Sequence, residues 1–231
     1  MNLSELLEKY RQGDRHFPGL DLKDLELVEI YLCEADFSGA DFRQARLGKS
    51  NFSGAKLTGA NLSEALLWGT NLSHADLSRA ILRDADLSGA KLEQANLTDA
   101  NLIKVNLSGA TLKEANLSRA MLLDADLRPT SDQPTNLESA NLSEANLSYA
   151  NLSQTILHRA NLDGAILCRA NLGLGRRLHG FQTDLREASL RGADLSYADL
   201  TGAILHDADL TGADITGTNF TDADLEGAKL P

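Results

Sequence analysis

The stretch Ala75-Asp76-Leu77-Ser78-Arg79 shows the pattern that most of the chain follows. Close variants return as Ala85-Asp86-Leu87-Ser88-Gly89, as Ala95-Asn96-Leu97-Thr98-Asp99 and as Ala198-Asp199-Leu200-Thr201-Gly202. A repeat of fixed period has to be recognised before any shorter motif is interpreted, because the repeat decides the architecture. The sequence therefore predicts a repeat protein.

Outward from this stretch, a large apolar residue occupies every fifth position of residues 22–127. The pattern breaks near residues 128–135, resumes over 137–172, breaks again near 173–183 and runs on over 185–230. There are 40 such centres, of which 35 are Leu, and the residue two before a centre is usually Ala. The first break is either an inserted loop or a distorted unit, and the sequence leaves both open.

A period of five fits neither an α-helix, with 3.6 residues per turn, nor a strand, with a period of two. Each unit is better explained as a short extended piece followed by a corner. The centre and the residue two before it then point the same way, as alternate residues of a strand do. Gly, Ser, Asp and Asn at the remaining positions suit tight turns. Units that turn in the same sense build a coil with Ala and Leu inside.

Residues 1–19 lie outside the repeat, and 20–231 form the repeat region. Leu3, Leu6, Leu7 and Tyr10 share one face of a helix, which predicts a short amphipathic α-helix over about residues 3–12, followed by a turn. Such a helix is too short to be stable alone in water. We expect it to cover the N-terminal end of the coil.

Tandem Ala-(Asp/Asn)-Leu-Xaa-Xaa units closely resemble the pentapeptide-repeat proteins, and the resemblance covers residues 20–231. It implies an all-β fold, a right-handed quadrilateral parallel β-helix with four units per coil. Forty units then make about ten coils, with the short α-helical cap at the N-terminus. The two breaks are expected to be loops that leave the coil at its corners.

Composition narrows the choice of partners. The net charge is −11, which argues against direct binding of nucleic acid or of an anionic membrane surface. No apolar run approaches the ~20 residues of a membrane span, and no signal peptide is recognisable. Only two cysteines occur, Cys33 and Cys168, so no disulfide framework is expected. We therefore expect a cytoplasmic protein.

The search for catalytic chemistry finds no candidate. Residues 173–178 contain Gly-Leu-Gly but fail the dinucleotide-binding fingerprint, since Leu178 stands at the sixth position. The five histidines are isolated, and the repeat itself generates the many carboxylate pairs. We expect no catalytic residue, no cofactor and no metal, and hence no enzyme.

Three features are candidate contacts with a partner. Leu66 and Trp68 flank the centre Leu67 and should therefore be exposed, which is unusual for an apolar pair. The second break carries two cations, Arg176 and Arg177, on an otherwise acidic chain. Residues 185–231 hold nine acids and three bases, among them Asp207 and Asp209, and so offer a docking face for a basic surface.

The function that these patterns favour is a non-enzymatic rod that binds another, unidentified protein. The alternative follows from the resemblance, because quinolone-resistance members of the family are acidic DNA mimics that bind DNA gyrase. In either case an uncovered last coil invites pairing with another chain. We therefore also predict a homodimer through the C-terminal coil.

Overall fold

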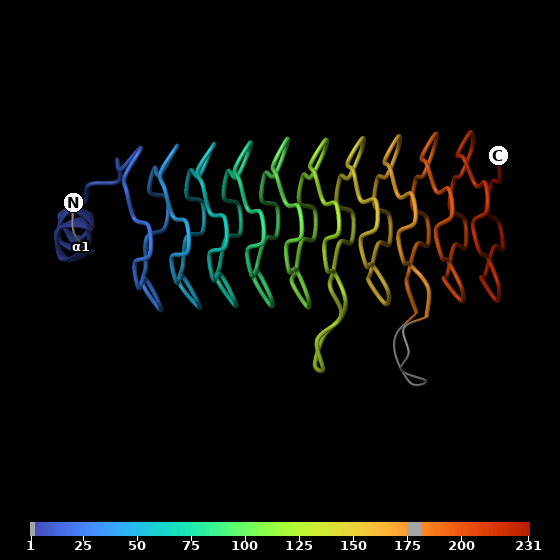
Figure 1. The fold of residues 1–231 in the computed structure, drawn as a ribbon, viewed down its shortest axis with the longest axis horizontal. Coiled ribbons are helices and arrows are strands. Elements are labelled where there is room, and N and C mark those ends of the chain that lie inside the picture. The colour runs from blue at the N-terminus through green and yellow to red at the C-terminus, as the bar shows by residue number, and fades with distance from the viewer. Residues whose placement is uncertain (1–2, 175–181) are drawn as a thin grey trace.

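The computed structural model describes residues 3–174 and 182–231. They form a straight rod with the two termini at opposite ends (Figure 1). The helix α1 (Leu3–Arg11) lies across the N-terminal end. From there the backbone winds in coils that stack along the rod axis, so the repeat region is a parallel β-helix.

A regular unit satisfies all five of its backbone N–H groups, as residues 95–99 illustrate. Asn96 donates to the preceding coil at 2.9 Å, while Leu97 and Asp99 donate to the following coil at 2.7 and 3.1 Å. Ala95 donates to a carbonyl of its own coil at 3.0 Å. The N–H of Thr98 donates to the side-chain Oδ1 of Asn96 at 3.2 Å. A backbone stacked on both sides requires this full pairing.

We name the five positions of a unit, in chain order, the inner residue, the bridge residue, the centre, and the first and second turn residues. Bridge residues pair in parallel with bridge residues 20 positions on, as Asn96 does with Asn116. This step equals four units, so the bridge residues fall on four ladders. Ladders 1 to 4 begin at His16, Asp21, Glu26 and Tyr31, respectively.

The bridge position favours Asp or Asn because the side-chain oxygen accepts the N–H of the first turn residue. Asp76 accepts from Ser78 at 3.1 Å in this way. The second turn residue has a positive φ, which is 62° at Gly89 and 58° at the non-glycine Asp99. The corner is therefore imposed by the stacked coils, and glycine is not required at each one.

The centres and inner residues fill the inside of the coil. Every centre from Leu22 to Leu210 is buried, as are most inner alanines. The centres of the last coil, Ile215, Phe220 and Leu225, are only partly buried against this core. Isolated leucines five apart in sequence thus become one continuous apolar core.

The regular coil begins before residue 20, where the sequence predicted the division. His16 already bridges to Asp36, and Phe17 occupies a centre position, buried and stacked on Phe37 with ring centroids 5.6 Å apart. Residues 15–19 are therefore part of the first coil. The sequence pattern missed this unit because its inner residue is Arg15 and Pro18 follows the centre.

The prediction of an N-terminal helix is confirmed, with bounds one residue shorter than expected at its end. Leu6 is fully buried against the first coil, and the Tyr10 hydroxyl donates to the Cys33 carbonyl at 3.2 Å. Gly13, with φ of 97°, follows the helix where a left-handed residue ends it. The apolar face of α1 thus covers the N-terminal end of the core.

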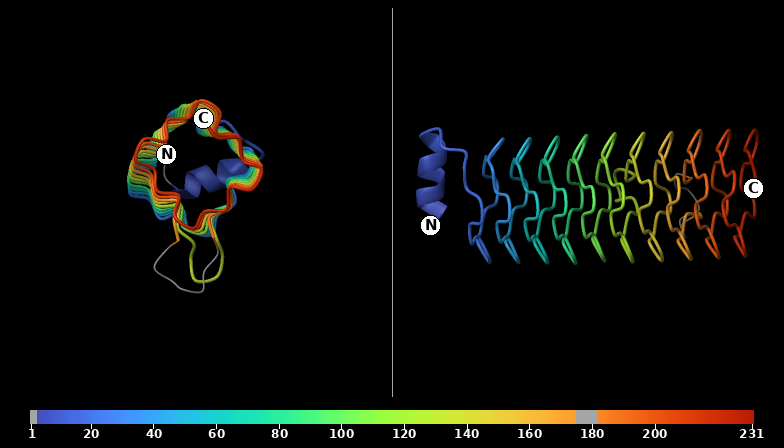
Figure 2. Two further views of the ribbon diagram at one scale, coloured as in Figure 1. Left: turned by 90° about the vertical axis from the view of Figure 1, so that its right-hand side faces the viewer. Right: turned by 90° about the horizontal axis from the view of Figure 1, so that it is seen from above.

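Both breaks lie between a rung of ladder 3 and the next rung of ladder 4, and the first one projects from the side of the rod (Figure 2). Across the first break, Thr111 bridges to Asn136, so that coil is longer than a regular one by the length of one unit. Across the second, Ile156 bridges to Asp184, a longer step still. The ladders continue unchanged beyond each break, so the first break is an inserted loop and not a distorted unit.

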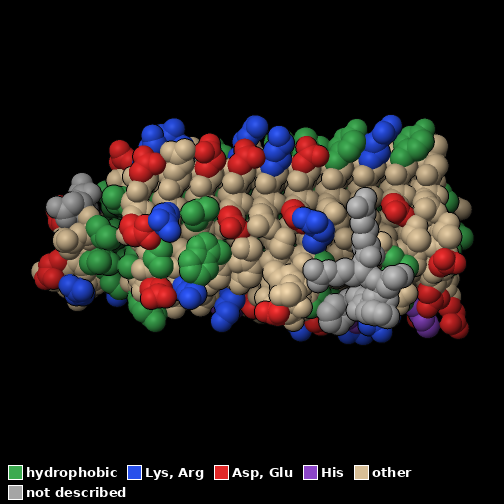
Figure 3. Space-filling view, turned by 60° about the horizontal axis from the view of Figure 1, so that its bottom comes forward, with side chains coloured by type: hydrophobic (Ala, Val, Ile, Leu, Met, Phe, Trp, Pro, Cys, Tyr) green, Lys and Arg blue, Asp and Glu red, His purple; other side chains and the backbone are tan. Residues whose placement is uncertain are grey.

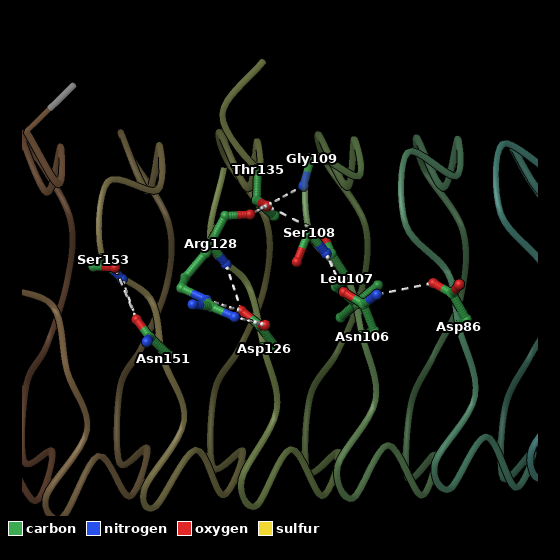
Figure 4. A network of polar contacts seen from close by, with 10 residues as sticks. All are labelled: Asp86, Asn106, Leu107, Ser108, Gly109, Asp126, Arg128, Thr135, Asn151 and Ser153. Carbon is green, nitrogen blue, oxygen red and sulfur yellow. Dashed lines mark hydrogen bonds and ion pairs between the residues drawn. The ribbon is translucent and has the colours of Figure 1, made fainter. Parts of the chain in front are cut away.

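A buried threonine is the first inner residue of the coil after each break. Thr135 Oγ1 accepts the Gly109 N–H at 2.8 Å and contacts the carbonyl oxygens of Leu107 and Arg128 at 3.1 and 3.0 Å (Figure 4). Thr183 Oγ1 likewise accepts the Gln154 N–H at 2.8 Å. In a regular corner a backbone carbonyl of the next coil accepts this N–H. The Gly109 N–H keeps that acceptor, the Arg128 carbonyl at 3.1 Å, and shares its hydrogen bond with Thr135. At the second break Thr183 Oγ1 takes the place of the backbone acceptor for the Gln154 N–H.

Candidate protein-binding surfaces

The inside of the coil offers no site in the part of the chain that the structure describes. A gap between core side chains, lined by Phe42, Leu57 and Leu72 among others, has no room for a water molecule. Across residues 3–174 and 182–231, no cluster of His, Cys, Asp and Glu is placed to hold a metal ion. A ligand or partner of the described residues must therefore meet the outer surface.

The described part of the chain contains no helix with the length and apolarity needed to cross a membrane. The helix α1 has nine residues.

Leu66 and Trp68 lie side by side at ladder 3, but only one of them is freely exposed. Leu66 is a bridge residue, paired with Arg46 and Asp86, and its exposed fraction is 37%. Trp68 is half-buried, because its ring lies over Gly48 one coil earlier. Lys49 Nζ lies 5.2 Å from the ring centroid. Trp68 was expected to be exposed and is instead half-buried, since a glycine at the same position of the preceding coil leaves room for its ring.

Asp207 and Asp209 occupy different positions of the coil and are both engaged. Asp207 is a second turn residue whose Oδ2 lies 3.2 Å from His206 Nε2. Asp209 is a bridge residue of ladder 1 that accepts from the Thr211 hydroxyl at 2.6 Å and from Lys229 Nζ at 3.2 Å. The Thr211 hydroxyl and N–H, with a smaller effect of Lys229, lower the pKa of Asp209 to about 2. Asp209 is thus a fixed negative charge at neutral pH.

The predicted contact residues that the structure describes do not converge on one site. Arg176 and Arg177 lie outside the described residues. Leu66 belongs to ladder 3, whereas Asp209 belongs to ladder 1 near the C-terminal end of the rod. The described contacts are therefore separate surface features, and they form no concave pocket with one another.

Many charged side chains pair between neighbouring coils. Arg119 Nε and Nη2 donate to Asp99 at 2.8 and 3.0 Å, and Arg159 Nε donates to Glu187 at 2.9 Å. These hydrogen bonds lower the pKa of the Asp99 and Glu187 carboxyl groups. Acidic and basic side chains are accordingly interspersed over the face in Figure 3. On this face the negative charge is therefore not gathered into one acidic surface.

Sequence reasoning missed an apolar strip along ladder 2. Among the described residues, five of the nine exposed large hydrophobic side chains belong to units of this ladder: Ile81, Met121, Tyr149, Ile166 and Tyr197. Half-buried Ile103 and Leu123 lie between them. We call this set of seven residues the apolar strip. Its rungs are separated in the sequence by whole coils, so they become neighbours only when the ladders are known.

The family model of pentapeptide repeats matches the chain in eight copies, over residues 26–63, 60–99, 95–128, 135–173, 182–207 and 193–230. A comparison with curated proteins gives no match.

Among solved structures, HetL from the cyanobacterium Nostoc sp. strain PCC 7120 is 55% identical over 100% of this chain and 98% of its own, with a TM-score of 0.98. It is described as a pentapeptide-repeat protein involved in the regulation of heterocyst differentiation. A second protein of Nostoc PCC 7120, alr5209, is 37% identical over 43% of this chain and 80% of its own, with a TM-score of 0.41.

QnrB1, a plasmid-mediated fluoroquinolone resistance protein, is 21% identical over 94% of this chain and 92% of its own, with a TM-score of 0.43. A likeness at this level says nothing about function. The family model and HetL, by contrast, each span most or all of the residues. The chain therefore belongs to the family of pentapeptide-repeat proteins, and its coil is the right-handed β-helix that membership implies.

Proposed function

We propose that this protein is a non-enzymatic, protein-binding rod that acts in the same process as HetL, the regulation of heterocyst differentiation. The observation that carries the proposal is the likeness to HetL, which is 55% in identity and 0.98 in TM-score along the entire chain. Action in the cytoplasm is part of the proposal, because the free thiols of Cys33 and Cys168 suit a reducing compartment.

The packing of the coil supports a binding role over a catalytic one. Leucine and alanine fill the interior along the rod, whereas small-molecule sites are concave pockets with a few convergent polar groups. Recognition would then take place on the outer rungs, whose bridge and turn residues vary while the core stays constant.

A four-sided rod of about ten coils is part of the same proposal. The regular step of the bridges and the four ladders support it. With a rise of ~4.8 Å per coil, ten coils give a rod roughly 48 Å long. Such a length provides a long, regular docking surface on each side.

Expression of this chain and of HetL, in parallel, in Nostoc filaments tests the proposed role through the frequency of heterocysts. We expect both proteins to change that frequency in the same direction. A matched control is Leu97→Asp, which places a carboxylate in the filled core and should abolish the effect. If the folded chain accumulates to the level of HetL and leaves the frequency unchanged, the proposed role is wrong.

The alternative of a gyrase-binding DNA mimic is not favoured by the charge distribution. A DNA mimic needs a continuous negative surface, whereas here cations such as Arg119 and Arg159 pair with acids of the adjacent coil. We therefore expect no effect of the protein, even in excess, on DNA supercoiling by gyrase. Inhibition of supercoiling would restore the alternative.

A homodimer through the C-terminal coil stays a prediction. It is supported by the partial exposure of the centres Ile215, Phe220 and Leu225, which a second coil would bury. If this dimer forms, Phe220→Asp should convert it to a monomer in sedimentation experiments. A wild-type protein that stays monomeric at high concentration would contradict it.

A further inference from the structure

The apolar strip on ladder 2 departs from the polar bridge pattern with exposed side chains. Bridge residues elsewhere are mostly Asp and Asn, but along this strip every second one is apolar: Ile81, Met121 and Ile166, separated by Asn101 and Asn146. Their exposed fractions are 37, 45 and 39%. Six consecutive rungs, from Ile81 to the unit of Tyr197, span about 24 Å at ~4.8 Å per rung.

Exposed aromatic residues extend the strip toward the C-terminal end. Tyr149 and Tyr197 are second turn residues with exposed fractions of 56 and 58%. Arg169 lies between them, with its guanidinium carbon 5.4 Å from the ring centroid of Tyr197. Tyrosine and arginine beside aliphatic side chains are typical of the residues that dominate protein interfaces.

Charged residues line both edges of the first three rungs of the strip, and their signs alternate along the rod. Each rung of ladder 2 is bounded by the second turn residue of the ladder 1 unit before it and by its own second turn residue. For three successive rungs these pairs are Arg79 and Asp84, Asp99 and Lys104, and Arg119 and Asp124. All six side chains are exposed. Within each rung the two edges therefore carry opposite charges.

This pattern is self-complementary about a twofold axis parallel to the rod. That axis places each rung against the same rung of a second copy and one edge against the opposite edge. Arg79 then meets Asp84 of the second copy, and Asp99 meets Lys104 of the second copy. Ile81, Met121 and Ile166 each meet their own counterparts, so apolar groups face apolar groups.

An antiparallel pairing cannot match the opposite charges and the apolar residues at the same time. Centred on Met121, it matches the apolar residues but sets Arg119 against Arg119 and Asp124 against Asp124. Centred between the rungs of Asn101 and Met121, it matches the charges but places apolar bridge residues against asparagines. Like charges facing each other oppose association, so the parallel pairing is the one consistent with the side chains.

We propose that the apolar strip is the interface of a parallel, side-by-side homodimer, with a second copy of this chain as its occupant. The existing ion pair of Arg119 with Asp99 lies along one edge and would be shared with Lys104 and Asp124 of the second copy. The strip is short and narrow, so we expect the dimer to be a reversible one with a dissociation constant in the micromolar range. This association is separate from the proposed role in differentiation.

Sedimentation equilibrium from micromolar to millimolar concentration tests the proposal. We expect a monomer–dimer equilibrium in the wild type and a monomer for Met121→Glu. Leu66→Glu is the matched control, because Leu66 is also an exposed apolar bridge residue but belongs to ladder 3. It should leave the dimer intact. Lys104→Glu should weaken the dimer at least tenfold at low salt and less at high salt.

Cross-linking determines the orientation. In a Cys33→Ser, Cys168→Ser background, each of the single substitutions Ile81→Cys, Met121→Cys and Ile166→Cys should give a covalent dimer with a short bis-maleimide. Leu66→Cys should not. A strictly monomeric wild type, a dimer that survives Met121→Glu but is lost in Phe220→Asp, or cross-linking at only one of the three positions would each overturn the proposal.

Discussion

At the residue scale, single side chains complete hydrogen bonds that the repeat alone would leave open. Thr183 is the clearest case, since its Oγ1 accepts the N–H of Gln154 beside the second inserted loop. Thr70 occupies the same position of a regular coil, where Oγ1 only donates to the Leu47 carbonyl. There the N–H of Lys49 has a backbone acceptor at 2.9 Å.

We therefore expect Thr183→Val to lower the free energy of unfolding by ~1–3 kcal/mol, because a buried N–H loses its acceptor. Thr70→Val should cost less, about 0.5–1.5 kcal/mol, since no donor is left unpaired. Urea denaturation followed by circular dichroism measures both. Equal losses in the two variants would show that Thr183 has no special role at the loop.

Asp209 allows a test of the electrostatics. Its pKa of about 2 in the folded protein lies below the ordinary value, first because of Thr211 and then because of Lys229. The ionised carboxylate therefore stabilises the folded state above about pH 4, near the unfolded pKa. That contribution is lost as the pH falls toward 2.

We expect a carboxyl NMR titration to place the Asp209 pKa near 2. Thr211→Val should raise the Asp209 pKa more than Lys229→Met does, because the hydroxyl is the larger cause. A larger increase in the lysine variant would mean that the ion pair dominates instead.

The sequence correctly predicted that the centres and the inner alanines point into the coil, because burial restricts the residue types at those positions. It could not predict that Trp68 packs over Gly48. That contact joins first turn residues of two successive coils, and the period of five alone does not give the length of one coil.

At the scale of elements, the interruptions do not disturb the regular coils on either side of them. The first loop lengthens one coil, and the bridges on both sides remain in register. The sequence predicted that both breaks exist and where they lie. The unit around Phe17 was not, since Arg15 and Pro18 hide it from the pattern.

Replacing residues 129–134 with a single glycine should restore a coil of regular length and leave the rod folded. Glycine suits the second turn position, where φ is positive in neighbouring coils, as at Gly89. We expect a melting temperature equal to or above that of the wild type. The same replacement with valine should lower it, because a β-branched residue is strained there. Loss of the folded rod in the glycine variant would contradict an independent loop.

At the scale of the whole molecule, residues that are distant in the sequence are aligned along the surface of the rod. Ile81, Met121 and Ile166 are far apart in the chain but lie two rungs apart on one ladder. The two loops lengthen their coils by different amounts and further disguise the alignment. Contacts chosen from local sequence, such as Leu66 and Asp209, were therefore scattered, and the apolar strip was overlooked.

Every surface described above depends on the regular step from one coil to the next. A disulfide trap tests it directly in a Cys33→Ser, Cys168→Ser background. Asn96 and Asn116 are bridged rungs, at a strand spacing of ~4.8 Å that a disulfide can span. We predict that Asn96→Cys with Asn116→Cys forms an intramolecular disulfide on mild oxidation, and that Asn96→Cys with Thr111→Cys, which lie on different ladders, does not. A disulfide in the second pair and not in the first would contradict the architecture.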